Sequence, residues 1–235
     1  MRQLCPLPLE DVDPASLYAA DARAPHADGR PWVLLNMIAT ADGATALDGR
    51  SGALGGTADK RVFAAIRSVA DVIVVAGGTV RAEGYGPPSG GARLAVVSGS
   101  LDLDPALRLF TQAKEGLRPW LVTTAKADAS SLGALVDDVI VAGDDRVDMV
   151  RAIDALGVRG ARVVLCEGGP SLNGQLVEAG ILDELCLSLA PLVAGGDSAR
   201  IAHGPTPPAP LAMRLDRVLE EDSYLFLRYL TNSTQ

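Results

Sequence analysis

The sequence has few aromatic residues, few histidines and few cysteines. Aromatic residues make up 4% of the 235 residues and hydrophobic residues 48%, so the core is expected to be aliphatic. The two histidines, His26 and His203, have no His or Cys partner at metal-ligand spacing, which argues against a zinc site. The three cysteines are scattered and two lie in apolar runs, so we expect buried thiols in a reducing cytoplasm.

The sequence also lacks an excess of basic residues and any long hydrophobic run. Its 21 Lys and Arg are outnumbered by 29 Asp and Glu, which gives a formal net charge of −8. Nucleic-acid binding requires a basic surface, so we do not expect it here. No apolar run reaches transmembrane length, and the N-terminus does not resemble a signal segment. We therefore expect a cytoplasmic protein that binds neither membrane nor nucleic acid.

Three widespread motifs are absent as well. The sequence contains no G-x-G-x-x-G fingerprint, no Walker A sequence and no G-x-S-x-G elbow. These absences argue against a Rossmann dehydrogenase, an ATP or GTP hydrolase and a serine acyl transferase.

Apolar runs typical of strands alternate with helical patterns along most of the chain. Residues 1–30, rich in Pro, Ala and Asp, are predicted to form an N-terminal extension, followed by one domain over residues 31–235. The last two predicted strands, residues 185–189 and 224–230, have no helix between them. This order predicts an α/β fold with a mostly parallel central sheet flanked by helices and with antiparallel C-terminal strands. The other predicted strands cover residues 33–38, 71–76, 94–98, 120–124, 138–142 and 163–166.

The sequence also predicts the structure of some segments between the strands. Residues 48–56 are rich in glycine and are expected to form a loop, after which Thr57 is expected to cap a helix. Another helix is expected over residues 147–156, ending at Gly157. Asp183 and Glu184 are expected in a solvated turn. The strand at 185–189 is expected in the core or at an edge, where it could pair across a dimer axis.

The segment 163–172, with the sequence VVLCEGGPSL, is the most informative one. A predicted buried strand ends at Glu167 and a Gly168–Gly169 turn, and Ser171 is expected to cap the following helix. Free backbone N–H groups and a helix N-terminus at the end of a strand favour a phosphate. A plain strand–helix connection has the same pattern, so this segment alone does not decide between the two.

Three strand ends combine glycine with polar residues: 42–43 (DG), 77–79 (GGT) and 167–169 (EGG). In an open α/β sheet, ligands bind at the carboxyl ends of the strands. Three such turns on one edge predict a nucleotide cofactor that lies across the sheet.

The order and spacing of four motifs resemble the riboflavin-biosynthesis pyrimidine reductases, the reductase domain of the bacterial deaminase-reductase, whose fold is dihydrofolate-reductase-like. The resemblance extends from about Trp32 to Leu230, and nothing matches the zinc signature of the deaminase half. The motifs are residues 36–43 (NMIATADG), Asp59 with Arg67, Asp71 and 77–79, then 167–172 (EGGPSL) with 182–185 (LDEL), and 190–196 (APLVAGG).

The resemblance implies an NADPH-dependent reduction of an amino-pyrimidine ribosyl phosphate, of the 5-amino-6-ribosylamino-uracil 5′-phosphate type, to its ribityl form by a homodimer. The protein would hold the cofactor against the sugar, exclude water and supply a proton. The residues implied to bind NADPH are Thr57, Asp59, Gly77, Gly78, Thr79, Val80, Ser98, Gly168, Gly169, Pro170, Ser171 and Leu172, and those implied to bind the substrate are Asn36, Asp42, Arg81, Glu83 and Glu167.

Asp42 is the first candidate for the catalytic proton donor and Glu167 the second. A carboxylate shielded by nicotinamide and base would have a raised pKa, which suits a proton donor near neutrality. Asp42 in an Asp-Gly pair is equally compatible with a plain turn, Thr79 with a helix cap, and Asn36 with hydrogen bonds inside the sheet.

The segment after Thr79 departs from the family pattern. It has the sequence RAEGYGPP over residues 81–88, so the substrate-side loop differs and Arg81 or Arg93 would have to supply the cation for the ribose phosphate. Two alternatives therefore remain open: a dihydrofolate or pterin reductase on the same scaffold, or a catalytically weak nucleotide-binding paralogue.

Overall fold

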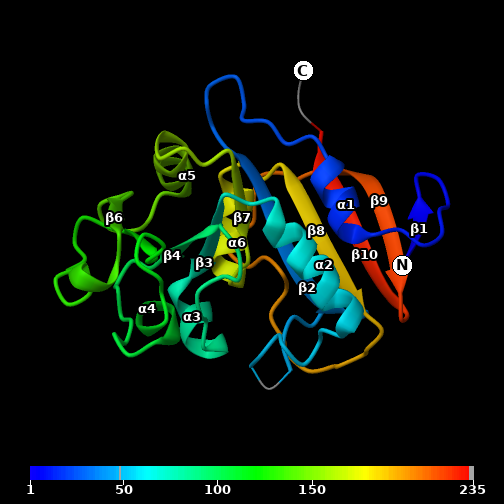
Figure 1. The fold of residues 1–235 in the computed structure, drawn as a ribbon, viewed down its shortest axis with the longest axis horizontal. Coiled ribbons are helices and arrows are strands. Elements are labelled where there is room, and N and C mark those ends of the chain that lie inside the picture. Colours follow the sequence, from blue (N-terminus) through cyan, green and yellow to red (C-terminus); the bar gives the residue numbers. More distant parts are fainter. Residues whose placement is uncertain (48, 233–235) are drawn as a thin grey trace.

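Ten strands form one sheet in the computed structural model, which describes residues 1–47 and 49–232 (Figure 1). The strands from β8 through β2, β7, β3, β4 and β5 to β6 are parallel, whereas β10, β9 and β1 continue the sheet with antiparallel pairing. The predicted α/β fold with antiparallel C-terminal strands is confirmed. In spatial order the strands are β1 (Arg2–Cys5), β9 (Met213–Glu221), β10 (Tyr224–Thr231), β8 (Glu184–Ala190), β2 (Trp32–Thr40), β7 (Val163–Cys166), β3 (Val72–Ala76), β4 (Arg93–Val97), β5 (Trp120–Thr123) and β6 (Asp138–Val141).

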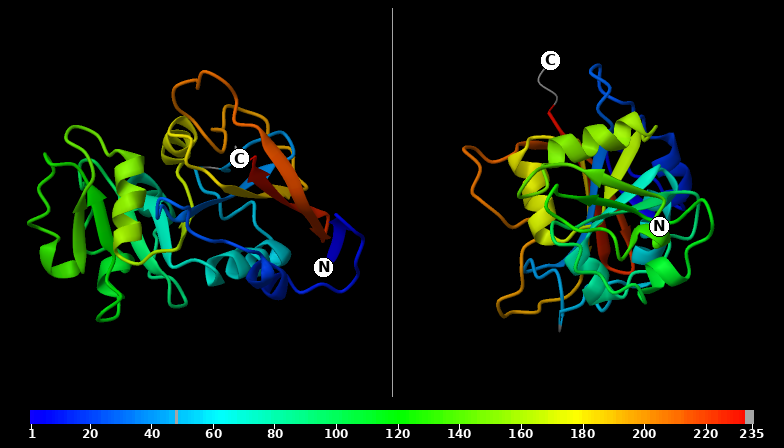
Figure 2. Two further views of the ribbon diagram at one scale, coloured as in Figure 1. Left: turned by 90° about the horizontal axis from the view of Figure 1, so that it is seen from above. Right: turned by 90° about the vertical axis from the view of Figure 1, so that its left-hand side faces the viewer.

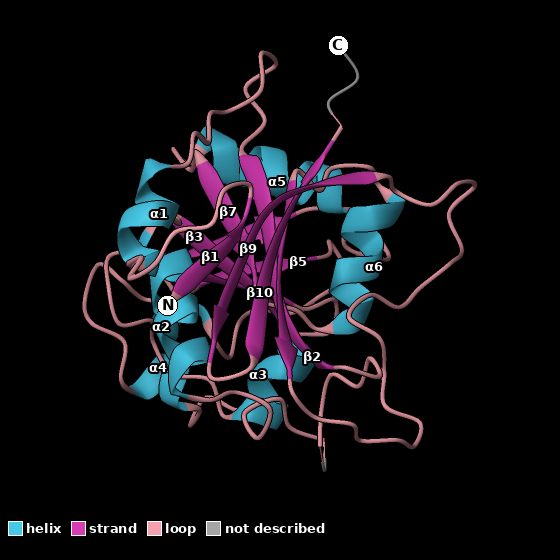
Figure 3. Ribbon diagram, turned by 90° about the vertical axis from the view of Figure 1, so that its right-hand side faces the viewer, coloured by secondary structure: helices cyan, strands magenta, loops and turns pink. Residues whose placement is uncertain are grey.

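Helices cover both faces of this sheet. Figure 3 shows α1, α2 and α4 on one side and α6 on the other, and Figure 2 shows the N-terminal strand at the end of the sheet opposite to the segment that contains β6. The two faces hold separate apolar clusters, one under α1 and α2 and one under α5 and α6. The helices are α1 (Pro14–Ala20), α2 (Thr57–Ser68), α3 (Gly77–Glu83), α4 (Arg108–Thr111), α5 (Met149–Val158) and α6 (Pro170–Glu178).

Amphipathic spacing explains how α2 docks on the sheet. Its buried residues Ala58, Val62, Ala65 and Ile66 recur at helical spacing and pack into the apolar cluster of that face. The central strands are apolar on both faces because helices cover both. No helix among the described residues has the length and apolar character needed to cross a membrane.

Two strands were not predicted, and the strand predicted in the core or at an edge lies inside the sheet. Both β1 and β9 were missed, and β9 fills the place between β1 and β10. The strand expected at residues 185–189 is β8, which pairs with β10 on one side and with β2 on the other. Its backbone groups are therefore engaged, and it cannot pair with a second subunit.

Several predicted helix boundaries are also wrong. Gly56 and Gly169 occupy the N-cap positions, so Thr57 and Ser171 are not caps. The helix α5 starts after Asp148 and continues past Gly157 to Val158. The expected glycine-rich loop begins at residue 48, which lies outside the described residues, as does the end of the predicted domain at residues 233–235.

The first thirty residues contribute a strand and a helix to this architecture. Tyr18 of α1 is 1% exposed within the apolar cluster, and Arg23 binds Glu184 of β8. Asp183 and Glu184 are buried, which corrects the expectation of a solvated turn. The division of the chain at residue 30 stays a prediction.

Candidate functional site

A cavity of about 510 Å³ lies between α2 and the carboxyl ends of β2 and β7. Side chains two residues apart share one face of a strand, so Asn36 and Ile38 follow the buried Leu34 on the face that α2 covers. Helix α2 contributes Asp59, Phe63 and Arg67, which are four residues apart and form one stripe. The wall is completed by Ser198 and Ala199 and by Thr45, Ala46, Gly49, Ser51, Gly52 and Gly55.

The cavity collects many of the residues predicted from sequence. Its lining includes the substrate candidates Asn36, Glu83 and Glu167 and the cofactor candidates Asp59, Gly78, Thr79, Gly168, Gly169 and Pro170. These residues come from β2, α2, α3 and the turn after β7. More than a hundred residues of sequence separate β2 from that turn. The fold thus assembles one site from the motifs that the sequence presents separately.

A second cavity, of about 450 Å³, is lined in part by the start of α6. Pro170 lines the first cavity, and the next two residues of α6, Ser171 and Leu172, line the second. No side chain caps α6, because its N-cap residue is Gly169. Consecutive residues at the start of α6 therefore line the two cavities.

Close packing requires a glycine in this turn. An ideal Cβ on Gly169 would lie 2.8 Å from Thr79 Oγ1, so the turn touches the first residues of α3. Gly168 has a φ of +91°, a conformation that other residues rarely adopt.

Other predicted residues line neither cavity. Val80 is a fully buried core residue, and the Ser98 hydroxyl accepts a hydrogen bond from the Leu101 N–H. Thr57 and Gly77 lie at helix starts, outside both linings.

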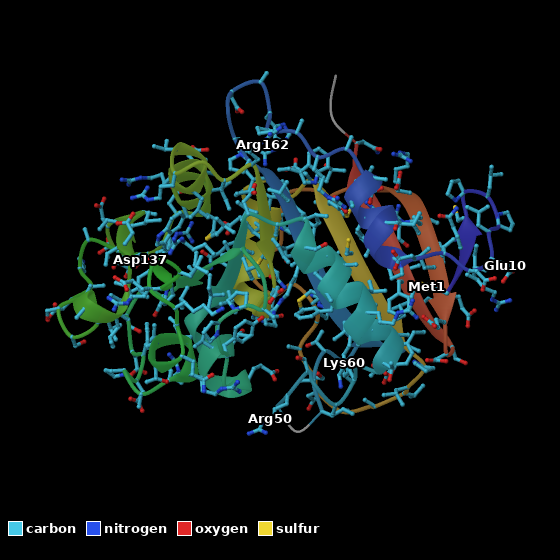
Figure 4. The ribbon with its side chains drawn as sticks, viewed as in Figure 1. Met1, Glu10, Arg50, Lys60, Asp137 and Arg162 are labelled. Carbon is cyan, nitrogen blue, oxygen red and sulfur yellow. The ribbon has the colours of Figure 1, made fainter. Side chains whose placement is uncertain are left out.

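The two arginines proposed for the ribose phosphate also lie elsewhere. Arg81 donates to the Asp102 carbonyl at 2.6 Å on the protein surface, and Arg93 donates to Asp137 at the start of β4. Neither lines the cavity, so the structure does not bring them together with the other predicted site residues, and their role at the ribose phosphate stays a prediction. Lys60 and Arg67 are the described cations in the lining, and Figure 4 shows Lys60 at the start of α2.

Glu167 and Arg67 form a buried ion pair in the cavity wall. Arg67 Nε and Nη2 each donate to a different carboxylate oxygen of Glu167 at 2.7 Å. The Arg67 Cζ atom lies 4.3 Å from the centre of the Phe63 ring. Tyr85 donates its hydroxyl to Glu167 as well. Burial raises the pKa of Tyr85 well above its ordinary value, and the Glu167 charge acts in the same direction, so the phenol stays protonated. Tyr85 was not predicted as a site residue, because nothing local in the sequence connects it to Glu167.

Asp42 does not have the environment expected of a proton donor. Its exposed carboxylate accepts hydrogen bonds from the Thr40 hydroxyl and from the N–H groups of Gly195 and Ala194, and these lower its pKa to about 2. The shift is opposite to the expected one, and Asp42 does not line the cavity. Its bonds connect the turn after β2 to residues 194–195, which lead into the cavity residue Ser198.

Replacement of Asp42 by Asn is expected to leave kcat within about threefold of wild type, because a neutral amide keeps the shape and some hydrogen bonds. KM should rise, by less than about tenfold, since the segment carrying Ser198 is held less firmly. Steady-state kinetics of the two proteins measure this. A fall in kcat of about a thousandfold would instead support direct proton transfer by Asp42.

Comparison with known proteins agrees with this architecture. A family model described as "RibD C-terminal domain" matches residues 31–225. The 2,5-diamino-6-ribosylamino-4(3H)-pyrimidinone 5′-phosphate reductase of Methanothermobacter thermautotrophicus is 28% identical over 186 residues, which cover 73% of this chain and 82% of the relative.

Two solved structures have a similar fold. A pyrimidine reductase-like protein from Corynebacterium diphtheriae superposes with a TM-score of 0.79 and 26% identity, over 94% of this chain and 99% of that one. Dihydrofolate reductase from Enterococcus faecalis, in a complex with NADP(H), has a TM-score of 0.51 and 13% identity, over 86% of this chain and 97% of that one. This second likeness concerns the fold alone, and it confirms the dihydrofolate-reductase-like architecture.

Proposed function

The chain belongs to the RibD C-terminal domain family, and from this premise we propose that it is an oxidoreductase that reduces the ribosyl group of an amino-pyrimidine ribosyl phosphate to the ribityl form with NADPH. The relative from Methanothermobacter thermautotrophicus is named for a reduction of this kind. The observation that carries the proposal is the pair of cavities lined by consecutive residues at the start of α6, because a dinucleotide and a second small molecule need neighbouring spaces.

The residues at this turn fit a nicotinamide dinucleotide. Gly78 and Thr79 of α3 and the turn residues Gly168 and Gly169 line the first cavity, while Ser171 and Leu172 line the second. The start of α6, which no side chain caps, offers the backbone N–H of Ser171 and the positive end of the helix dipole to a phosphate, because Pro170 has no N–H and Leu172 and Asn173 donate to the Gly169 carbonyl. When bound, the nicotinamide supplies the hydride.

The remaining lining would hold the pyrimidine and its ribosyl chain. Lys60 takes part in no ion pair among the described residues, and we propose that it attracts the substrate phosphate in place of Arg81 or Arg93. Thr45, Ala46, Ser51, Ser198 and Ala199 complete the lining and would help to exclude water. Asn36 and the Arg67–Glu167 pair offer hydrogen-bonding groups to the base.

The proposed function is tested by following NADPH oxidation with the ribosylaminopyrimidine 5′-phosphate, in both its 2-amino and its deaminated form, beside dihydrofolate. Oxidation with either pyrimidine, and not with dihydrofolate, is the expected result. Oxidation with dihydrofolate alone would support the pterin reductase in its place. Tight NADPH binding without oxidation by any of the three would support the binding paralogue.

Substitution of Gly169 by Ala is expected to weaken NADPH binding about tenfold or more, because the new Cβ forces Thr79 away from the turn. Gly169 has a φ of −78°, which alanine also adopts, and the thermal stability of the variant is measured alongside. Fluorescence titration with NADPH measures the effect. Gly133→Ala is the matched control, since an added Cβ there meets no atom within 4 Å. Equal NADPH affinity of the two variants would argue against cofactor binding at this turn.

We also propose a cytoplasmic homodimer. Because β8 is paired on both sides, a dimer formed through a strand edge would have to use β1 or β6, the two ends of the described sheet. Sedimentation equilibrium measures the subunit number, and a monomer at micromolar concentration would contradict the proposal.

A further inference from the structure

Asp59 reaches the cavity from the first turn of α2. Its carboxylate rests beside Gly55, where an ideal Cβ would lie 2.6 Å from Oδ2, so a glycine at this position makes room for it. Ser188 of β8, which pairs with Ile38 in the sheet, lies near the carboxylate. The side chain is thus held in the cavity lining and is partly buried.

The other carboxylates of the lining already have strong partners. Glu167 is paired with Arg67 through both oxygens, and Glu83 accepts two hydrogen bonds from Ser51 at Oε1. Asp59 takes part in none of the ion pairs among the described residues, although Lys60 follows it in the chain. It is therefore the lining carboxylate with both oxygens available as acceptors.

A carboxylate in such a place favours a ligand that presents N–H donors. Its two oxygens can accept two parallel N–H groups, and hydrogen bonds to an ionised acceptor are stronger than neutral ones. A pyrimidinone with an amino group at C2 presents that amino group and an adjacent ring N–H side by side. A uracil presents a carbonyl oxygen at C2, which a carboxylate repels.

We infer that Asp59 binds the 2-amino edge of the pyrimidine and so selects the 2-amino substrate over its 2-oxo counterpart. This inference rests on the proposed function. It assigns Asp59 to substrate binding, whereas the family resemblance implied that Asp59 binds NADPH. It makes this residue a determinant of which base the reductase accepts.

The selectivity should depend on pH. Burial raises the pKa of Asp59, while the nearby Ser188 hydroxyl and the charge of Lys60 act against that shift. The other groups around it are Tyr224 of β10, which contacts Gly56, and the charged cavity residues Arg67, Glu83 and Glu167. Because the ionised carboxylate accepts the two bonds, the preference for the 2-amino substrate should fall as the pH falls through this raised pKa.

The test compares kcat/KM for the 2-amino and 2-oxo ribosylaminopyrimidine phosphates in wild type, Asp59→Asn and Asp59→Glu. Asp59→Asn should lower kcat/KM for the 2-amino substrate about 100-fold, mainly through KM, and change the 2-oxo value less than about threefold. Asp59→Glu should recover part of the preference, since it restores the carboxylate. Asp154→Asn, on the exposed side of α5, is the matched control and should change neither value.

A binding measurement separates recognition from turnover. Calorimetric titration with the two reduced ribityl products, without cofactor, should show tighter binding of the 2-amino product by wild type and no such preference in Asp59→Asn. Equal loss for both products, or no loss, would overturn the role of Asp59 even if wild type reduces the pyrimidine. Absence of both reduction and binding in wild type would overturn the proposed function, and the role of Asp59 with it.

Discussion

Substitution of Glu167 by Gln is expected to lower kcat/KM for the pyrimidine substrate by about 100- to 1000-fold, because it breaks the ion pair that fixes one wall of the cavity. The carboxylate accepts one hydrogen bond from each of two Arg67 nitrogens and a third from Tyr85. A glutamine has the same size but offers a single acceptor oxygen, so one of these donors must turn away. Arg67 would then stand in the cavity without its counter-charge.

The consequence of Glu167→Gln is a change of charge as well as of shape. The described charged residues of the lining are Lys60 and Arg67 against Asp59, Glu83 and Glu167, so the substitution removes one of three negative charges. The freed guanidinium is expected to bind phosphate at a position that suits neither the hydride transfer nor the base.

Tyr85→Phe is the matched control for Glu167→Gln. It removes one donor but leaves the Arg67–Glu167 pair intact, so kcat/KM should fall by less than about tenfold. Steady-state kinetics with both variants test the difference. Comparable losses of kcat/KM in the two variants would mean that the Tyr85 hydroxyl, and not the Arg67–Glu167 ion pair, is what the activity requires.

The central sheet could be predicted because its strands are short, continuous apolar runs. Residues 72–76 and 163–166 are almost wholly buried, and burial on both faces leaves a signal that needs no partner to be recognised. The strand β9 gave no such signal, because residues 213–221 contain charged side chains. Arg217 is buried against Asp21, which lies almost two hundred residues earlier in the chain. Its burial depends on a contact that periodicity cannot reveal.

The same limit applies to the site. The motifs around Gly78, Gly169 and Glu167 could be found because glycine and acidic residues at strand ends have a local meaning. The state of each carboxylate depends on distant residues. Asp42 is bonded by the amides of Ala194 and Gly195, whereas Asp59 is left without a cation. The sequence shows which carboxylates lie near the site. It does not show which of them receive hydrogen bonds or a counter-charge from distant residues.

Glu184 is the group whose loss should destabilise the protein most. It is completely buried in β8 and accepts hydrogen bonds from Arg23, Arg228 and Trp32. Burial alone would raise its pKa, but the hydrogen bonds from Arg23 and Arg228 outweigh it and lower the pKa to about 2. Its charge thereby connects the N-terminal segment to the antiparallel half of the sheet.

Glu184→Ala is expected to lower the free energy of unfolding by about 3 kcal/mol, because Arg23 and Arg228 lose the fully buried carboxylate between them and keep only Asp21 and Asp216 as partners. Urea unfolding followed by circular dichroism measures this, with Glu220→Ala as the control, since Glu220 forms an exposed pair with Arg2 and should matter far less. The contribution of Glu184 should also depend on pH. Its folded pKa lies below the ordinary 4.5, so the contribution is complete above about pH 4.5 and is lost as the pH falls towards 2. Similar unfolding midpoints for Glu184→Ala and Glu220→Ala would show that the buried cluster contributes no net stability.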